Sequence, residues 1–157
     1  ITGGTFDKEY DAVKGDLTFQ NTHLPTILET VKCEVSIELE IQSLVDSLYM
    51  DATQRQKIVE SCRASSERQI VITHGPDTMT ATAEKLIADG VGRDRTIVLT
   101  GAMVPFTVNG SDALFNLGGA IIAAQTLADG VYIVMHGRVF PAAMVRKDRS
   151  AGRFVRA

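Results

Sequence analysis

Features typical of membrane, nucleic-acid or metal binding are scarce in this sequence. No apolar run approaches the roughly 20 residues of a membrane-spanning helix, and no signal peptide is found. The net charge is −3 and no block of basic residues occurs, which argues against a nucleic-acid partner. The only basic cluster, between Arg146 and Arg156, is interrupted by Asp148 and is more typical of a solvated face or a subunit contact.

Cysteines and phosphate-binding motifs are equally sparse. Cys33 and Cys62 lie far apart without a CxxC motif, so we expect two buried free thiols in a reducing, cytoplasmic compartment. The three histidines and two cysteines show no zinc-ligand spacing, and we expect no metal. GxGxxG and GxxxxGK[ST] are both absent, which argues against a phosphate-binding loop. The chain also lacks an initiator methionine, which is typical of a start that is missing or processed.

What is present fits one α/β domain over residues 1–157. Four apolar runs end in the small-residue turns TGG, THG, TGA and MHG. We predict strands over residues 69–74, 95–100 and 131–135, and helices over residues 51–63, from 77 to about 89, and 112–128. These helices are long enough for crossovers between parallel strands. The pattern therefore predicts a three-layer fold, with a mainly parallel sheet, helices on both faces and the glycine turns at one rim.

The remaining segments carry weaker patterns. Residues 6–21 are polar and aperiodic, which predicts a long loop that carries Tyr10. Residues 24–31 predict a short helix, and the alternation over residues 33–39 predicts an edge strand with one wet face. Asp51 and Gln54 form an approximate capping box. Gly118 and Gly119 would allow close helix packing, and Phe140 and Phe154 could anchor the polar tail.

The stretch QIVITHGPDTM, residues 69–79, organises the chain. A buried strand ends at His74, and Asp77 and Thr78 follow at the start of a helix. In parallel α/β sheets, ligands bind at the carboxyl ends of strands. The alternative is that Asp77 or Thr78 serves only as a helix N-cap.

The residues at this rim suggest hydrolytic chemistry. The candidate groups are Thr5, Tyr10, Ser47, His74, Asp77, Thr78, His136 and Lys147. A threonine hydroxyl needs a group that takes its proton, and a lysine beside an aspartate can relay that proton. A Thr–Lys–Asp set would suit attack on an amide, with backbone N–H groups of the turns stabilising the oxyanion. We expect the two histidines to be structural, each ring bonding backbone at the rim.

The same residues resemble a known family. TGGT at residues 2–5 and HGPDTM at residues 74–79 are similar to the two signatures of bacterial-type L-asparaginases. Further collinear matches are DSLYM at 46–50, TIVLTGAMVP at 96–105, SDALFNLGGAI at 111–121, GVYIVMHGRV at 130–139, and VRK around Lys147. The resemblance covers nearly the whole chain and implies a Rossmann-like or flavodoxin-like N-terminal domain.

The resemblance implies hydrolysis of L-asparagine to L-aspartate and ammonia without a cofactor. Thr5 would be the nucleophile that forms an acyl-enzyme, assisted by Tyr10. Asp77 would hold the substrate α-amino group and orient Lys147. The substrate pocket would be formed by Asp46, Ser47, Gly75, Pro76 and Ala102, with Ser47 contacting the α-carboxylate.

Two departures from the family pattern matter. The second signature normally reads HGTDT, so Pro76 replaces a threonine whose hydroxyl belongs to the Thr–Lys–Asp relay. Proline also removes a backbone N–H. The chain is about half the usual family length, and no residue matches the glutamate that the C-terminal domain supplies to a neighbouring subunit. The continuous tail favours a short family branch over an isolated N-terminal domain.

The leading hypothesis is thus an asparaginase-type amidohydrolase with activity impaired by Pro76. The alternative is a catalytically silent amino-acid-binding protein on the same scaffold. A third hypothesis, an amidase with another substrate, rests on Leu48, because that position is often polar in longer members of the family. A rim site without a second domain would lie open to water, so we expect a homodimer or homotetramer with a small-molecule substrate.

Overall fold

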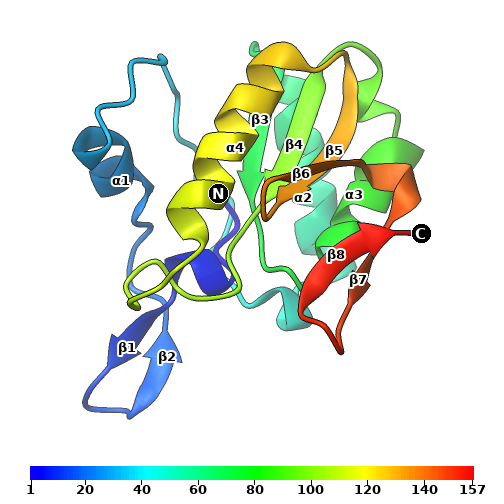
Figure 1. Ribbon diagram of the computed structural model, residues 1–157. Helices are drawn as coiled ribbons and strands as arrows, with labels where there is room; N and C mark the ends of the chain where they lie inside the picture. Colours follow the sequence, from blue (N-terminus) through cyan, green and yellow to red (C-terminus); the bar gives the residue numbers. More distant parts are fainter.

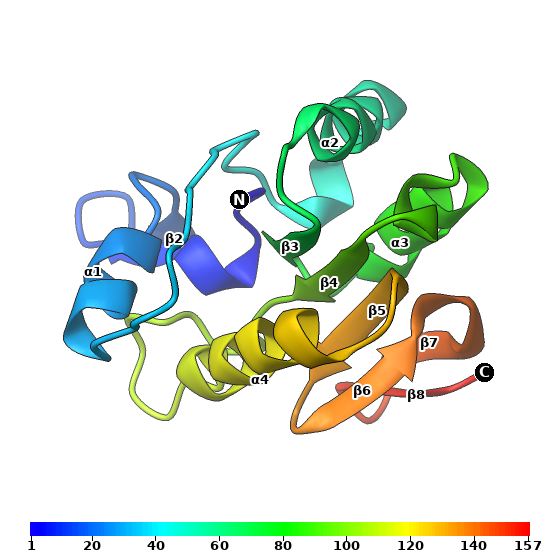
Figure 2. The same cartoon turned by 90° about the horizontal axis from the view of Figure 1, so that it is seen from above.

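The computed structural model describes residues 1–157 and contains a four-stranded sheet between two layers of helices (Figures 1 and 2). The strand order is β3 (Gln69–Thr73), β4 (Thr96–Thr100), β5 (Gly130–Met135) and β6 (Arg138–Pro141). β3, β4 and β5 are parallel, and β6 pairs antiparallel with β5. The prediction of a mainly parallel α/β sheet is therefore confirmed.

Helices cover the sheet as the crossover argument requires. α2 (Ala52–Ala64) and α3 (Met79–Ala88) lie on one face, and α4 (Ala113–Thr126) lies on the other (Figure 2). Asp51 caps α2 in a full capping box, in which its carboxylate accepts from the Gln54 amide at 2.8 Å. α3 ends before Gly90, which adopts a φ of 69° that favours glycine.

The core divides along the two faces because alternate strand residues point to opposite sides. Ile72, Leu99 and Ile133 pack with the residues of α2 and α3. Val98 and Val134 pack against Ala120 and its neighbours on α4. β4 is buried along its whole length, as expected for a central parallel strand.

The first 50 residues lie beyond β3 and differ from expectation in two places. They contain η1 (Thr5–Asp7), the hairpin β1 (Glu9–Asp11) and β2 (Asp16–Thr18), α1 (Leu24–Thr30) and η2 (Ser47–Tyr49). The hairpin replaces most of the predicted loop. The predicted edge strand over residues 33–39 is wrong, because no neighbouring strand offers a hydrogen-bonded ladder to this segment. Alternation alone makes a strand possible, but backbone pairing is what forms one.

The C-terminal tail folds back onto helix α3. η3 (Val91–Arg93) precedes β4, while η4 (Ala142–Met144), β7 (Val145–Asp148) and β8 (Arg153–Arg156) follow β6. Phe140 and Phe154 are buried in the larger core cluster and anchor the tail as predicted. No helix of the chain has the length and apolar character needed to cross a bilayer.

Candidate active site

Three glycine turns meet at the carboxyl ends of the parallel strands. A Cβ on Gly4 would lie 2.2 Å from the Gly75 nitrogen, and one on Gly101 would lie 2.2 Å from the His74 carbonyl oxygen. A Cβ on Gly75 would lie 2.5 Å from Ser47 Oγ. Glycine at these positions lets the loops approach closely, so the segments bearing Thr5 and Ser47 lie against the HGPD turn.

An ion pair joins the HGPD turn to the tail. Lys147 Nζ, on β7, donates to Asp77 Oδ1 at 2.6 Å. The Lys147 side chain is only 10% exposed, whereas that of Asp77 is 36% exposed. The second Asp77 oxygen makes no hydrogen bond with the protein. The fold thus brings together two candidate residues that lie 70 positions apart in the chain.

Neither Asp77 nor Thr78 caps α3 with its side chain. Thr78 Oγ1 instead donates to the Ser47 carbonyl at 2.8 Å and accepts from Arg55 Nη2 at 3.0 Å. This link ties the HGPD turn to the turn before α2. The interpretation of these side chains as simple helix caps is therefore wrong. Sequence reasoning missed Arg55, which lies on α2 with no motif to mark it.

Ser47 and Asp46 differ in how many hydrogen bonds their side chains make. Ser47 Oγ is buried and has no hydrogen-bond partner. Asp46 accepts from the Leu48 amide at 3.0 Å, and its other oxygen accepts from Lys8 Nζ at 2.6 Å. Burial acts to raise the pKa of the Asp46 carboxyl, but the hydrogen bonds from Lys8 and Leu48 outweigh it and lower the pKa.

Thr5 and Tyr10 are less engaged. Thr5 opens η1, is partly buried, and its hydroxyl makes no hydrogen bond. Tyr10 is 64% exposed on the hairpin that projects from the body of the domain (Figure 1). The Tyr10 hydroxyl makes no hydrogen bond with the other candidates. Pro76 and Ala102 are both buried within the turns that follow β3 and β4.

A second carboxylate, which sequence reasoning did not single out, organises the turn after β4. Asp112 accepts from the Met103 and Val104 amides at 2.9 and 3.0 Å, and from Asn116 Nδ2 at 2.8 Å. Its fourth partner is His136 Nε2 at 2.9 Å. Burial acts to raise the pKa of Asp112, but these hydrogen bonds lower it. The only signal in the sequence was its place at the start of a helix after a strand and turn.

The two histidines at the rim are not equivalent. His74 is fully buried, and its ring contacts the Gly75 carbonyl and Thr82 Oγ1, both at 2.8 Å. Burial lowers the pKa of His74 to about 4, so its ring is neutral near pH 7. His136 contacts the Asp112 carboxylate, so the expectation of a backbone contact for its ring is wrong. No group of three or more histidine, cysteine, aspartate or glutamate side chains is arranged to hold a metal ion.

A mainly parallel domain with polar groups at the carboxyl ends of its strands belongs to the class of α/β proteins that bind ligands at that edge of the sheet. Comparisons with known proteins identify the family. The family model for the asparaginase N-terminal domain matches residues 1–154. The chain therefore belongs to the asparaginase family.

Individual relatives agree with this assignment. L-asparaginase 2 of Escherichia coli is 34% identical over 126 residues, which cover 78% of this chain and 35% of that protein. The L-asparaginase of Thermococcus kodakarensis is 36% identical over 83 residues, which cover 53% of this chain and 25% of that protein. The crystal structure of L-asparaginase I from Vibrio cholerae is similar in fold, with a TM-score of 0.81 at 22% identity, covering 99% of this chain and 49% of the other. The chain thus spans half or less of the length of these relatives.

Proposed function

We propose that this domain hydrolyses a side-chain amide, with L-asparagine as the substrate to test first. The observation that carries the proposal is the Asp77–Lys147 ion pair beside the glycine turns that hold Thr5 and Ser47. A partly exposed carboxylate with one free oxygen and a nearly buried lysine is a pair suited to binding a cation and moving a proton. Membership of the asparaginase family supports the same reaction class.

In the proposed reaction, Thr5 Oγ attacks the amide carbonyl and forms an ester with the acyl group. The proton lost by the hydroxyl reaches the amide nitrogen, which leaves as ammonia. Water then cleaves the ester and restores Thr5. Backbone N–H groups of the clustered turns, around Gly75 and Ala102, would stabilise the oxyanion of each step.

The substrate backbone would be held by groups that lack protein partners. The free Asp77 oxygen would accept from the α-ammonium group. Ser47 Oγ, buried and without a partner, would donate to the α-carboxylate. Asp46 would act by positioning, because its two oxygens already bond Leu48 and Lys8. Tyr10 would have to approach by movement of the projecting hairpin.

Pro76 is expected to weaken this reaction. A threonine at that position would offer the hydroxyl that the family resemblance assigns to the Thr–Lys–Asp relay, and proline offers neither a hydroxyl nor an N–H. Lys147 bonds Asp77 and not Thr5, whose hydroxyl makes no hydrogen bond. The route for the first proton transfer is therefore incomplete.

Ammonia release from L-asparagine by this chain and by its Pro76→Thr variant tests the proposal. We expect the variant to be about 100-fold faster or more, since members of a catalytic set act together. Thr5→Ala in the Pro76→Thr background should abolish the gain. If Thr5→Ala leaves the rate unchanged, the proposed nucleophile is wrong.

A silent amino-acid-binding protein is the second candidate, and the missing hydroxyl at Pro76 favours it. This candidate keeps Ser47 and Asp77 for the zwitterion. Calorimetry would support this candidate over hydrolysis if this chain and its Pro76→Thr variant both bind asparagine or aspartate tightly without releasing ammonia.

The outer face of α4 suggests how the domain could assemble. Leu114, Phe115 and Ile122 are exposed on the outer face of α4, where Gly118 faces open space. This apolar face would fit a homodimer or homotetramer contact, which sedimentation analysis can detect. We propose a cytoplasmic location, because Cys33 and Cys62 are both free thiols.

A further inference from the structure

Arg55 makes hydrogen bonds only to neutral oxygens. It lies in the first turn of α2, and its guanidinium donates to the Met50 and Asp51 carbonyls at 2.7 and 3.3 Å. It also donates to Thr78 Oγ1 at 3.0 Å, and its Nε is buried without a partner. Partly burying a cation without a counter-ion lowers stability, and such exceptions occur mainly at functional sites.

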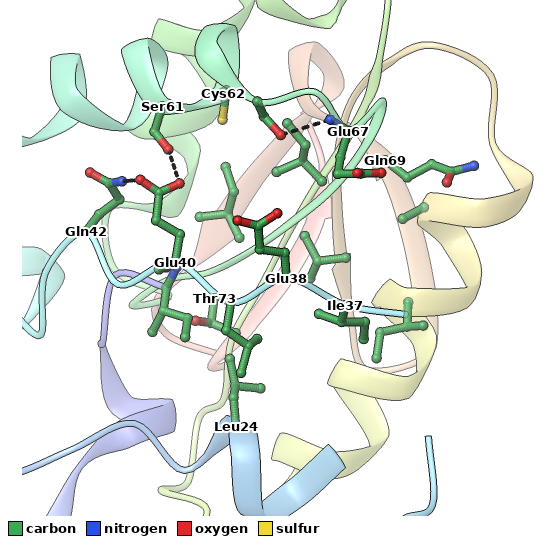
Figure 3. A pocket seen from close by; sticks show the side chains of 18 of the residues that line it. Leu24, Ile37, Glu38, Glu40, Gln42, Ser61, Cys62, Glu67, Gln69 and Thr73 are labelled. Carbon is green, nitrogen blue, oxygen red and sulfur yellow. Dashed lines mark hydrogen bonds between the residues drawn. The ribbon is translucent and has the colours of Figure 1, made fainter. Parts of the chain in front are cut away.

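The later turns of α2 have different surroundings. Ser61 and Cys62 lie beside a cavity of about 710 Å³ between residues 35–42 and β3 (Figure 3). Arg55 does not line this cavity, and neither does Thr78. The contacts of Arg55 therefore concern the rim of the sheet and not the cavity.

A chain of two hydrogen bonds runs from Arg55 to the backbone of Ser47. Arg55 Nη2 donates to Thr78 Oγ1 at 3.0 Å, and Thr78 Oγ1 donates its own proton to the Ser47 carbonyl at 2.8 Å. A hydroxyl that accepts from a cation becomes a stronger donor, so Arg55 strengthens the second bond. Without Arg55, the Thr78 oxygen would lose its donor and the hydroxyl would be free to turn to other partners.

Both ends of this chain lie next to groups that we propose hold the substrate. Thr78 directly follows Asp77, whose free oxygen would accept from the α-ammonium group, and Ser47 Oγ would donate to the α-carboxylate. The same guanidinium also holds the carbonyl of Met50, which directly follows η2, the turn that begins with Ser47. One planar group thus fixes the turn of Asp77 against the turn of Ser47.

We propose that Arg55 is a positioning residue, which sets the separation of Asp77 and Ser47 through Thr78 and thereby the affinity of the site for an α-amino acid. This inference rests on the proposed function of the rim. Asp77 and Ser47 would hold the substrate and the transition state alike, so the loss of Arg55 should raise KM and leave kcat nearly unchanged.

Calorimetry of L-aspartate binding tests the proposal without requiring hydrolysis. We expect Arg55→Gln to weaken binding about tenfold, because it breaks a charge-assisted hydrogen bond. Arg55→Lys should weaken binding as much, since a lysine keeps the charge but lacks the planar fork that joins Met50 and Thr78. Arg63→Gln, at an exposed arginine of the same helix, is the matched control and should have no effect. Restored affinity in Arg55→Lys would overturn the proposal.

A double-variant cycle tests the path through Thr78. Thr78→Val leaves the guanidinium bonded to Met50 and should weaken L-aspartate binding as much as Arg55→Gln does. The double variant should bind no worse than either single variant, because both changes break the same chain. Additive losses would contradict the inference. Thr78→Val also supplies the test if the Arg55 variants do not fold.

Kinetics in the Pro76→Thr background separate positioning from a structural role. Arg55→Gln should raise KM for L-asparagine about tenfold and change kcat by less than about twofold. A lower kcat with an unchanged KM would overturn the inference. If neither this chain nor its Pro76→Thr variant binds aspartate or asparagine, the proposed function fails and takes this inference with it. If they bind and Arg55→Gln binds equally well, only this inference fails.

Discussion

Asp77 and Asp112 occupy similar places in the chain but have different surroundings. Each follows a buried parallel strand and a small-residue turn, and each precedes a helix that returns to the sheet. Asp112 accepts hydrogen bonds from Met103, Val104, Asn116 and His136. Asp77 accepts only one, from Lys147, and keeps an oxygen free.

The difference separates a structural carboxylate from a candidate functional one. A carboxylate has about four acceptor sites, and at Asp112 protein donors use all of them. It therefore holds the turns after β4 and β5 in place but has no capacity for a ligand. Asp77 has that capacity, at a rim where three glycine turns meet. Saturation of hydrogen bonding, and not position in the chain, distinguishes the two.

The largest expected effect separates the two aspartates by activity. In the Pro76→Thr background, Asp77→Asn should lower ammonia release by about 1,000-fold, because it removes the charge that holds Lys147 and the substrate ammonium. Thermal unfolding should change little. If the activity survives, Asp77 has no part in the chemistry and the contrast with Asp112 fails.

The next effect separates them by stability. Asp112→Ala leaves two backbone amides and the Asn116 amide without their acceptor, and we expect it to lower the free energy of unfolding by about 3 kcal/mol. Asp77→Ala breaks one partly exposed ion pair and should cost about 1 kcal/mol. Urea unfolding of the two variants measures both values. Equal losses would show that Asp77 is as structural as Asp112.

The smallest effect extends the comparison to His74, which lies beside the Asp77 turn. Above pH 6.5 the ring is neutral in both the folded and the unfolded chain. Below that pH the unfolded chain binds a proton, but folded His74 stays neutral until its pKa of about 4. Stability should therefore fall by about 2 kcal/mol between about pH 7 and pH 5. Unfolding of the His74→Gln variant at the same pH values is the control, and an equal fall in both proteins would contradict the assignment.

Local patterns predicted the elements that depend on local physics. The β-branched run before His74 and the capping box at Asp51 specify β3 and the start of α2 without reference to other parts of the chain. The glycine turns predicted a common rim, because parallel strands that end in tight turns place those turns at one edge. The pairing of Lys147 with Asp77 was expected from the family resemblance alone, since nothing local links residue 147 to residue 77.

Other features depend on partners that local patterns do not contain. Residues 33–39 alternate as a strand should, yet they form none, because no other strand pairs with them. Tyr10 lies on a hairpin that projects from the body of the domain, and its side chain is largely exposed (Figure 1). Pairing and loop direction are long-range properties, so one-dimensional periodicity does not determine them.

By itself, the sequence determined the α/β class, the strands β3, β4 and β5, the helices between them and the small-residue turns at one rim. These follow from hydrophobic periodicity, capping and the conformational freedom of glycine. Only the tertiary structure decided that Asp112 is saturated while Asp77 is open, and that Ser47 Oγ has no partner. Each of these depends on hydrogen-bond partners that come from distant parts of the chain. Those partners meet only once the chain has folded.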